Sequence, residues 1–263
     1  MTANMKKIPI TKLRYFYESL SKLSLSTETQ LNIVKDISRK DNPKKLISWY
    51  KESKNNFAEY ENIGEPFLPN RLDKWRKHPN KVETTISRTP DVISVFQERN
   101  PQIVVDDSDY NFEYIQREVP TYRTTKAEFR LGKKNRSGSG GIDFIGFNCN
   151  NLLPILGEIK VEGDQNTFYA LIQLLTYLSE LSTTDQIKRI NKYKLFGNIP
   201  DLTSKTSFYL YILLAFTQLG PIKRKILDET RNLAKHLEKP NIQEIEKIVF
   251  LKMHPATKII TKV

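Results

Sequence analysis

Two apolar segments, residues 140–146 and 155–161, carry charges that strands of this composition normally exclude. Asp143 lies in the first segment, and Glu158 and Lys160 lie in the second. Because side chains alternate between the two faces of a strand, Glu158 and Lys160 should point to one face and their apolar neighbours to the other. An unpaired charge is costly to bury, so these residues need a partner. A divalent cation together with a phosphate would supply one.

The chemistry that fits this arrangement is hydrolysis of a phosphodiester bond. Mg²⁺ is usually held by one or two carboxylates together with water and substrate phosphate, and Asp143 and Glu158 would be those carboxylates. A metal held in this way lowers the pKa of a bound water and offsets charge that develops on the phosphate. Lys160 would orient the attacking water and face the scissile phosphate.

The order of these residues resembles the PD-(D/E)XK nuclease superfamily, which includes restriction endonucleases, archaeal Holliday-junction resolvases and RecB-type nucleases. Asp143 precedes the tripeptide Glu158-Ile159-Lys160 by 158 − 143 = 15 positions, and a glycine-rich loop precedes Asp143. The helix expected after this tripeptide carries Gln173 and Tyr177, which is similar to the Gln-x-x-x-Tyr motif of the RecB-type branch. The resemblance covers roughly residues 126–216, and the first hundred residues match no family.

This resemblance implies a fold and an activity. The implied fold class is α/β, with a restriction endonuclease-like mixed sheet flanked by helices and an αβββαβ core, to which the apolar periodicity of the first residues adds an N-terminal helical region. The activity is that of a Mg²⁺- or Mn²⁺-dependent endo- or exodeoxyribonuclease, in which Asp143 and Glu158 bind the metal. Lys160 acts in catalysis and Gln173 supports the site. DNA is the expected substrate, and RNA stays open as an alternative.

Hydrophobic periodicity predicts much of this architecture without the family. Apolar residues recur at helical spacing between residues 11 and 60, with Thr27 at the start of a capping box. Prolines between residues 61 and 90 indicate a connector, so we divide the chain into a mostly helical region, 1–88, and a nuclease-like domain, 89–263. Helices are expected at 91–100, 166–181 (capped by Asp164) and 222–237. Strands are expected at 112–116, 126–131, 142–147, 155–161, 208–214, 245–250 and 257–263.

The family commonly adds a further acid, for which this chain offers Glu98, Glu118 and Glu128. Glu98 matches by its position on the helix before the first strand. Glu128 rests on geometry, because a hairpin between its strand and the strand of Asp143 can place both acids on one face of the sheet. A shift of one residue would move Glu128 to the other face. We favour Glu128, while a solvent-facing strand glutamate explains the same position equally well.

Basic residues suggest where a nucleic acid would lie. The glycine- and serine-rich loop at 132–141 carries Lys133, Lys134 and Arg136, which could grip a phosphodiester backbone beside Asp143. A plain turn with solvated lysines is the competing interpretation. Two further basic stretches, 188–194 and the cations of the helix at 222–237, have the same two interpretations, and charge runs are usually solvated faces.

Composition limits the class of partner. The chain has 42 Lys and Arg against 30 Asp and Glu, a net charge of +12. This charge alone fits a polyanionic partner such as DNA and a solvated basic surface about equally well. Together with the candidate site at Asp143, Glu158 and Lys160, it favours the polyanion. Cys149 is the only cysteine, so an intrachain disulfide and a zinc site of several cysteines are excluded. No signal peptide or membrane-spanning run is evident, so we expect a cytoplasmic protein with no membrane partner. The oligomeric state stays open, with a homodimer as one option.

Two other function classes compete with the nuclease. A nuclease-like fold could bind nucleic acid without the reaction, or Asp143, Glu158 and Lys160 could form a structural ion pair in a protein–protein adaptor. Carboxylates that converge beside Lys160 would favour the enzyme. Diverging side chains, or an arginine in the site, would favour the binding module.

Overall fold

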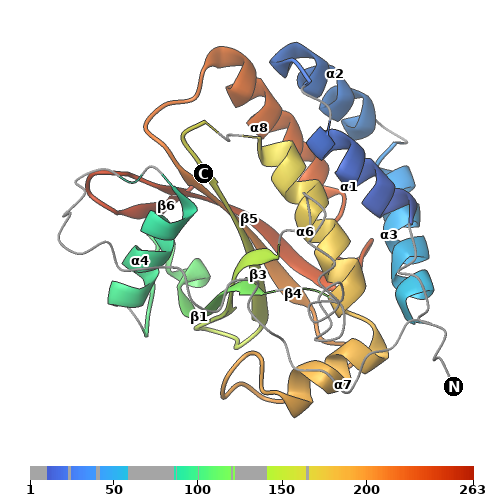
Figure 1. The fold of residues 1–263 in the computed structure, drawn as a ribbon, viewed down its shortest axis with the longest axis vertical. Coiled ribbons are helices and arrows are strands. Elements are labelled where there is room, and N and C mark those ends of the chain that lie inside the picture. Colours follow the sequence, from blue (N-terminus) through green and yellow to red (C-terminus); the bar gives the residue numbers. More distant parts are fainter. Residues whose placement is uncertain are drawn as a thin grey trace, which may run out of the picture.

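The computed structural model describes residues 11–22, 25–39, 42–58, 86, 88–99, 101–119, 121, 141–163 and 166–263. Over these residues the protein is mixed α/β, with seven α-helices around a six-stranded mixed sheet (Figure 1). The helices are α1 (Lys12–Lys22), α2 (Thr27–Ser38), α3 (Pro43–Ala58), α4 (Thr89–Arg99), α6 (Thr167–Leu181), α7 (Thr184–Lys192) and α8 (Pro221–Lys235). The strands are β1 (Phe112–Val119), β2 (Ile142–Asn148), β3 (Pro154–Val161), β4 (Phe208–Ala215), β5 (Ile245–Met253) and β6 (Ile260–Lys262).

The strands lie side by side in sequence order, from β1 to β6. Antiparallel pairing joins β1 to β2, β2 to β3 and β5 to β6, whereas β3–β4 and β4–β5 are parallel. Parallel neighbours need a crossover connection, which α6 and α7 provide before β4 and α8 provides before β5. The strands predicted around Asp143 and Glu158, the buried strand after residue 207 and the final antiparallel pair are all confirmed.

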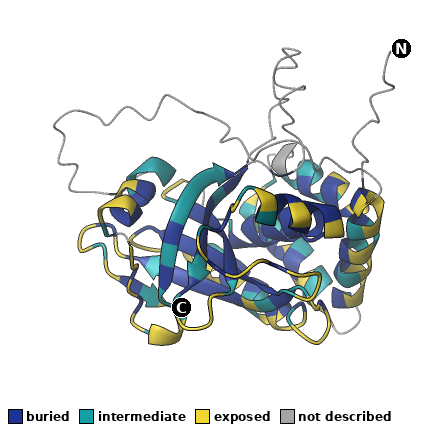
Figure 2. Cartoon of the chain, turned by 90° about the horizontal axis from the view of Figure 1, so that it is seen from below, coloured by how far each residue is buried: buried dark blue, intermediate teal, exposed yellow. Residues whose placement is uncertain are grey.

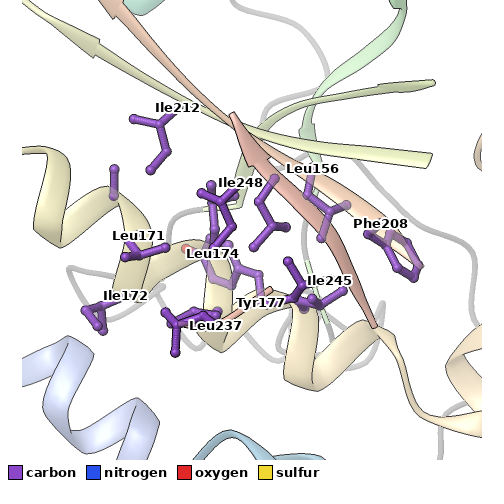
Figure 3. Packing of buried hydrophobic residues seen from close by; sticks show 14 of the residues in the cluster. Leu156, Leu171, Ile172, Leu174, Tyr177, Phe208, Ile212, Leu237, Ile245 and Ile248 are labelled. Carbon is purple, nitrogen blue, oxygen red and sulfur yellow. The ribbon is translucent and has the colours of Figure 1, made fainter. Parts of the chain in front are cut away.

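Helices cover both faces of the sheet, as the two-sided apolar pattern of β2 and β3 predicts. On one face Phe96 of α4 packs edge-on against Phe112 and Phe144. On the other face α6 and α8 bury a second cluster, in which Figure 3 shows Leu174 near Leu156. Figure 2 shows that the buried residues gather in the sheet and on the helix sides that face it.

The N-terminal helices belong to the second of these layers. α1 and α3 pack on α6, and α2 packs on α8, so their apolar residues join the cluster that α6 forms with the sheet. The helical prediction for this region is confirmed, but α2 is capped by Ser26 rather than Thr27, because the Ser26 hydroxyl accepts from the Thr29 N–H. Likewise α6 is capped by Asn166 rather than Asp164, since the Asn166 side chain accepts from the Tyr169 N–H.

Helix α7 was missed from the sequence, because its basic run was interpreted only as a charged surface. Thr183 caps this helix, and one of its cations, Arg189, is buried and donates to Gln186 at 3.0 Å. Lys188 pairs instead with Asp185 on the same helix at 2.8 Å. The run therefore divides between the interior and the surface, and is not one continuous cationic strip.

A glycine is required at position 157 of β3, immediately before Glu158. A Cβ atom there would overlap the Phe144 ring, which is itself held between Phe96 and Phe112. Because the ring has no room to move, we expect Gly157→Ala to destabilise the protein by about 1–3 kcal/mol, as overpacking in a core does. Urea unfolding of the variant checks this, and an unchanged midpoint would show that the ring can shift.

Candidate functional site

Glu158 and Lys160 of β3 point toward α6 and meet a polar residue of that helix. The Lys160 ammonium donates to one Glu158 carboxylate oxygen at 3.1 Å, and the Gln173 amide donates to the other at 2.9 Å. All three side chains are buried, with 2–6 % of their surface exposed. Their apolar neighbours Ile155 and Ile159 lie in the α4 layer, so the predicted alternation of faces is confirmed. The sequence-predicted trio Glu158, Lys160 and Gln173 is thus one hydrogen-bonded cluster.

Asp143 of β2 lies next to this cluster. The antiparallel register pairs Phe144 with Gly157, and one further step places Asp143 across from Glu158, since 143 + 158 equals 144 + 157. The Asp143 carboxylate accepts the backbone N–H of Ile159 at 2.8 Å. The Asp143 side chain thus accepts a hydrogen bond that a backbone carbonyl of β2 would accept if the β2–β3 ladder continued. This bond holds half-buried Asp143 beside Glu158 and Lys160.

Two tyrosines extend the cluster to α1. The Lys160 ammonium lies 5.0 Å from the centre of the Tyr169 ring, a cation–π contact. Tyr17 of α1 stacks on the same Tyr169 ring, with the two ring centres 5.2 Å apart and an interplanar angle of 20°. Sequence reasoning missed both roles. The four-residue spacing between Tyr169 and Gln173 was a usable signal, whereas nothing in the sequence connects Tyr17 to a site so far along the chain.

The tyrosine of the Gln-x-x-x-Tyr motif, Tyr177, lies one helical turn beyond Gln173. Its hydroxyl lies 3.4 Å from that of Tyr17. Burial raises the pKa of Tyr177, and the negative charge of Glu158 raises it further. Burial is also the main reason that the pKa of Tyr17 is raised. Both phenols therefore stay neutral and act as hydrogen-bonding groups at neutral pH.

These raised tyrosine pKa values predict how stability depends on pH. A group whose pKa is higher in the folded state contributes its stability below its unfolded pKa, about 10 for tyrosine, and loses that contribution as the pH rises beyond it. We expect the free energy of unfolding to fall as the pH rises from about 10 to about 11, and to fall less in Tyr17→Phe, which has no phenol to ionise at that position. Equal losses in the two proteins, measured by urea unfolding, would contradict this.

Strand register places one of the three candidate acids, Glu118, beside Asp143. On β1 the pairs Arg117↔Phe144 and Val119↔Ile142 leave Glu118 across from Asp143, so Glu118, Asp143 and Glu158 occupy neighbouring positions on three strands. Glu118 also has a φ of 45°, a left-handed conformation that a non-glycine residue adopts only at a cost. Strain of this kind often accompanies functional positions.

Of the two other candidate acids, the described one, Glu98, does not join the cluster. Glu98 lies on α4, the helix of the opposite face, where it is largely exposed and pairs with Lys258 at 3.8 Å. Glu128 lies outside the described residues, as do Lys133, Lys134 and Arg136 of the basic loop. The strand at 126–131 whose pairing with the strand of Asp143 motivated Glu128 also lies outside the described residues, and within the described residues β2 pairs with β1 and β3.

The chemistry of the donor set suits a hard divalent cation. Among the described residues, no group of three or more His, Cys, Asp or Glu side chains is arranged to hold a metal ion. Mg²⁺ does not need such a group, because it commonly takes one or two carboxylates and completes its shell with water and phosphate. Asp143 and Glu158 supply the two carboxylates of that smaller requirement, and a carboxylate oxygen can accept more than one interaction.

Comparison with known proteins adds no family to these observations. The chain matches no protein-family model, no curated protein and no solved structure. None of the helices in the described ranges is long and apolar enough to span a membrane.

Proposed function

We propose that the protein is a metal-dependent nuclease that hydrolyses phosphodiester bonds, with DNA as its substrate. The observation that carries this proposal is the buried Glu158–Lys160–Gln173 cluster with Asp143 across from Glu158. A buried ion pair contributes little stability relative to apolar residues of similar volume. Here it lies on the otherwise apolar strand β3 and collects two carboxylates beside one ammonium group, which is the combination that phosphodiester hydrolysis uses.

Each residue has a distinct role in this proposal. Asp143 and Glu158 would hold Mg²⁺ or Mn²⁺, which when bound supplies an activated water and offsets phosphate charge. Lys160, held by Glu158 and the Tyr169 ring, keeps a cation facing the reacting phosphate. Gln173 holds the second Glu158 oxygen and so fixes the direction of that carboxylate.

The order of elements supports the same proposal. With the short helix α7 set aside, the elements α4, β1, β2, β3, α6 and β4 follow the order αβββαβ, with three antiparallel strands followed by a parallel fourth strand. A restriction endonuclease-like core has this order. We therefore propose the restriction endonuclease-like fold as the finer description of the mixed sheet.

The direct test is incubation with single-stranded, double-stranded and branched DNA, with and without Mg²⁺ or Mn²⁺. We expect metal-dependent cleavage of at least one substrate, and its loss in Asp143→Asn. A matched control is Asp201→Asn, which removes an exposed acid from a surface pair with Lys194 and should leave cleavage unchanged. Cleavage that survives in Asp143→Asn would contradict the proposed site.

Metal binding also predicts a change in thermal stability. A ligand that binds only the folded state stabilises it, so millimolar Mn²⁺ or Mg²⁺ should raise the thermal midpoint by about 2–4 °C for each kcal/mol of binding. The rise should vanish in Asp143→Asn, measured by differential scanning fluorimetry. Without metal the substitution should be close to neutral, because an amide oxygen can still accept the Ile159 N–H. A large loss of stability without metal would identify Asp143 as a structural partner instead.

A second function is favoured by one specific observation. Both oxygens of Glu158 already accept hydrogen bonds from side chains of this chain, as a site that holds the fold without the reaction would require. A nucleic-acid-binding module of this kind should bind DNA with a steep dependence on salt and without turnover. The cleavage assay separates the two functions, since the module gives binding but no product.

A further inference from the structure

A second basic feature lies on the same sheet face as Lys160, beyond the end of β4. It is a pocket of about 240 Å³ between the β4–α8 connection, α8 and β5. Apolar residues, among them Leu214 and Leu227, form part of its wall. Three cations also line it: Arg224, Arg231 and Lys252.

The strand register connects this pocket to the candidate site. Lys160 of β3 pairs with Leu214 of β4, and Leu214 pairs with Lys252 of β5. In-register residues of parallel strands project to the same face, and Leu214 lies in the apolar layer beneath α6 and α8. Two strand spacings separate Lys160 from Lys252, about 10 Å. DNA rises about 3.4 Å per nucleotide of each strand, so this distance spans only a few nucleotides.

The cations of the pocket are available to a ligand. Within the described part of the chain, neither Arg224 nor Arg231 forms an ion pair, and Lys252 donates only to the Thr217 carbonyl oxygen at 3.3 Å. The two arginines are seven residues apart on α8, which places them on one side of the helix two turns from each other. One carboxylate, Asp228, also lines the pocket, so the cations outnumber it.

The size and charge of the pocket indicate the class of ligand. Its volume lies below the roughly 300–1,000 Å³ of pockets that enclose small organic molecules. Guanidinium groups bind phosphate through paired hydrogen bonds, and the net charge of the chain is +12. We propose that this pocket binds a backbone phosphate of the DNA strand whose scissile phosphate faces Lys160. This inference rests on the proposed nuclease function and adds the path of the strand, past the carboxyl ends of β3 and β4 to the first turns of α8.

Binding of a short fluorescent DNA, measured without divalent metal over a range of salt, tests the pocket separately from cleavage. The double variant Arg224→Gln/Arg231→Gln should lose about tenfold or more in affinity, and its salt slope should fall by about 1, the value for one phosphate contact. The matched control is Lys225→Gln/Lys235→Gln, which removes the same charge from exposed positions of α8 outside the pocket. It should change affinity by less than about twofold. Asp228→Asn should tighten binding, because it removes the only carboxylate side chain among the residues described as lining the pocket.

Replacing single phosphates with neutral methylphosphonates then locates the contact. We expect one linkage at which the replacement weakens binding to the wild type but not to the arginine double variant. Loss of affinity specific to the arginine variant, in a protein that never cleaves DNA, would support the pocket and overturn the nuclease proposal. Equal losses of DNA affinity in the arginine and lysine double variants would overturn the pocket. The same conclusion would follow if every methylphosphonate replacement weakened binding equally in the wild type and the arginine variant. Neither result would affect the cleavage test.

Discussion

Replacing Lys160 with methionine is expected to lower the rate of DNA cleavage by about 10²- to 10³-fold, the usual cost of removing one preorganised group that faces developing charge. Lys160 is buried between the Glu158 carboxylate and the Tyr169 ring, so a cation from the solvent should not replace its charge in the variant. Single-turnover cleavage with saturating Mg²⁺ measures the loss. A suitable control is Lys247→Met, which removes a half-exposed cation of β5 that pairs with Glu238. This variant should cleave normally.

Lys160→Met could also weaken the fold, because it leaves the Glu158 carboxylate buried without its cation. A double variant, Glu158→Gln/Lys160→Met, separates the two effects. Replacing both members of a buried pair with neutral groups is often close to neutral for stability. We therefore expect the double variant to recover stability in urea unfolding while cleavage stays absent. Cleavage at the wild-type rate in the double variant would rule out this cluster as the site of reaction.

The largest effect on stability is expected from Arg14→Met in α1. The Arg14 guanidinium donates to the Glu180 carboxylate of α6, which also accepts the Thr121 hydroxyl. Both members of the ion pair are almost fully buried. Removing one member leaves the other charge uncompensated in the interior, so we expect a loss of about 3–5 kcal/mol in the free energy of unfolding.

An exposed pair provides the contrast for Arg14. Lys194 and Asp201 lie 2.7 Å apart with more than half of each side chain exposed. Lys194→Met should therefore cost no more than about 1 kcal/mol. The double variant Arg14→Met/Glu180→Leu should recover most of the loss seen in Arg14→Met, because no buried charge remains. If urea unfolding gave the single variant Arg14→Met a free energy of unfolding within about 1 kcal/mol of the wild type, the buried ion pair between Arg14 and Glu180 would be contradicted.

These variants also bear on how the chain is divided. The sequence separates a helical region, 1–88, from a domain beginning at residue 89, because prolines lie between them. The apolar faces of α1–α3 nevertheless pack into the cluster formed by α6, α8 and the sheet. Through Tyr17 and Arg14, α1 contacts the helix that carries Gln173. We expect a protein lacking α1 to lose stability and to hold Lys160 less firmly.

The features of this protein that depend on local pattern could be predicted from the sequence. Period-two alternation predicted that Glu158 and Lys160 share a face, and apolar residues on both faces predicted a sheet with helices on each side. Helical spacing predicted that Gln173 borders the core stripe of α6. Each of these rests on residues within one or two elements, so chain geometry alone was sufficient.

Contacts between residues far apart in the sequence could not be predicted in this way, because they depend on how the elements pack. Tyr17 reaches Tyr169, Arg14 reaches Glu180, and Glu118 lies across from Asp143, in each case because separate elements pack or pair. Which strands pair, and in which register, follows from the packing of the whole sheet. A prediction that pairs β2 with a different strand therefore places a different acid across from Asp143. The sequence therefore named the charged residues of β2 and β3, while the fold selected the side chains that surround them.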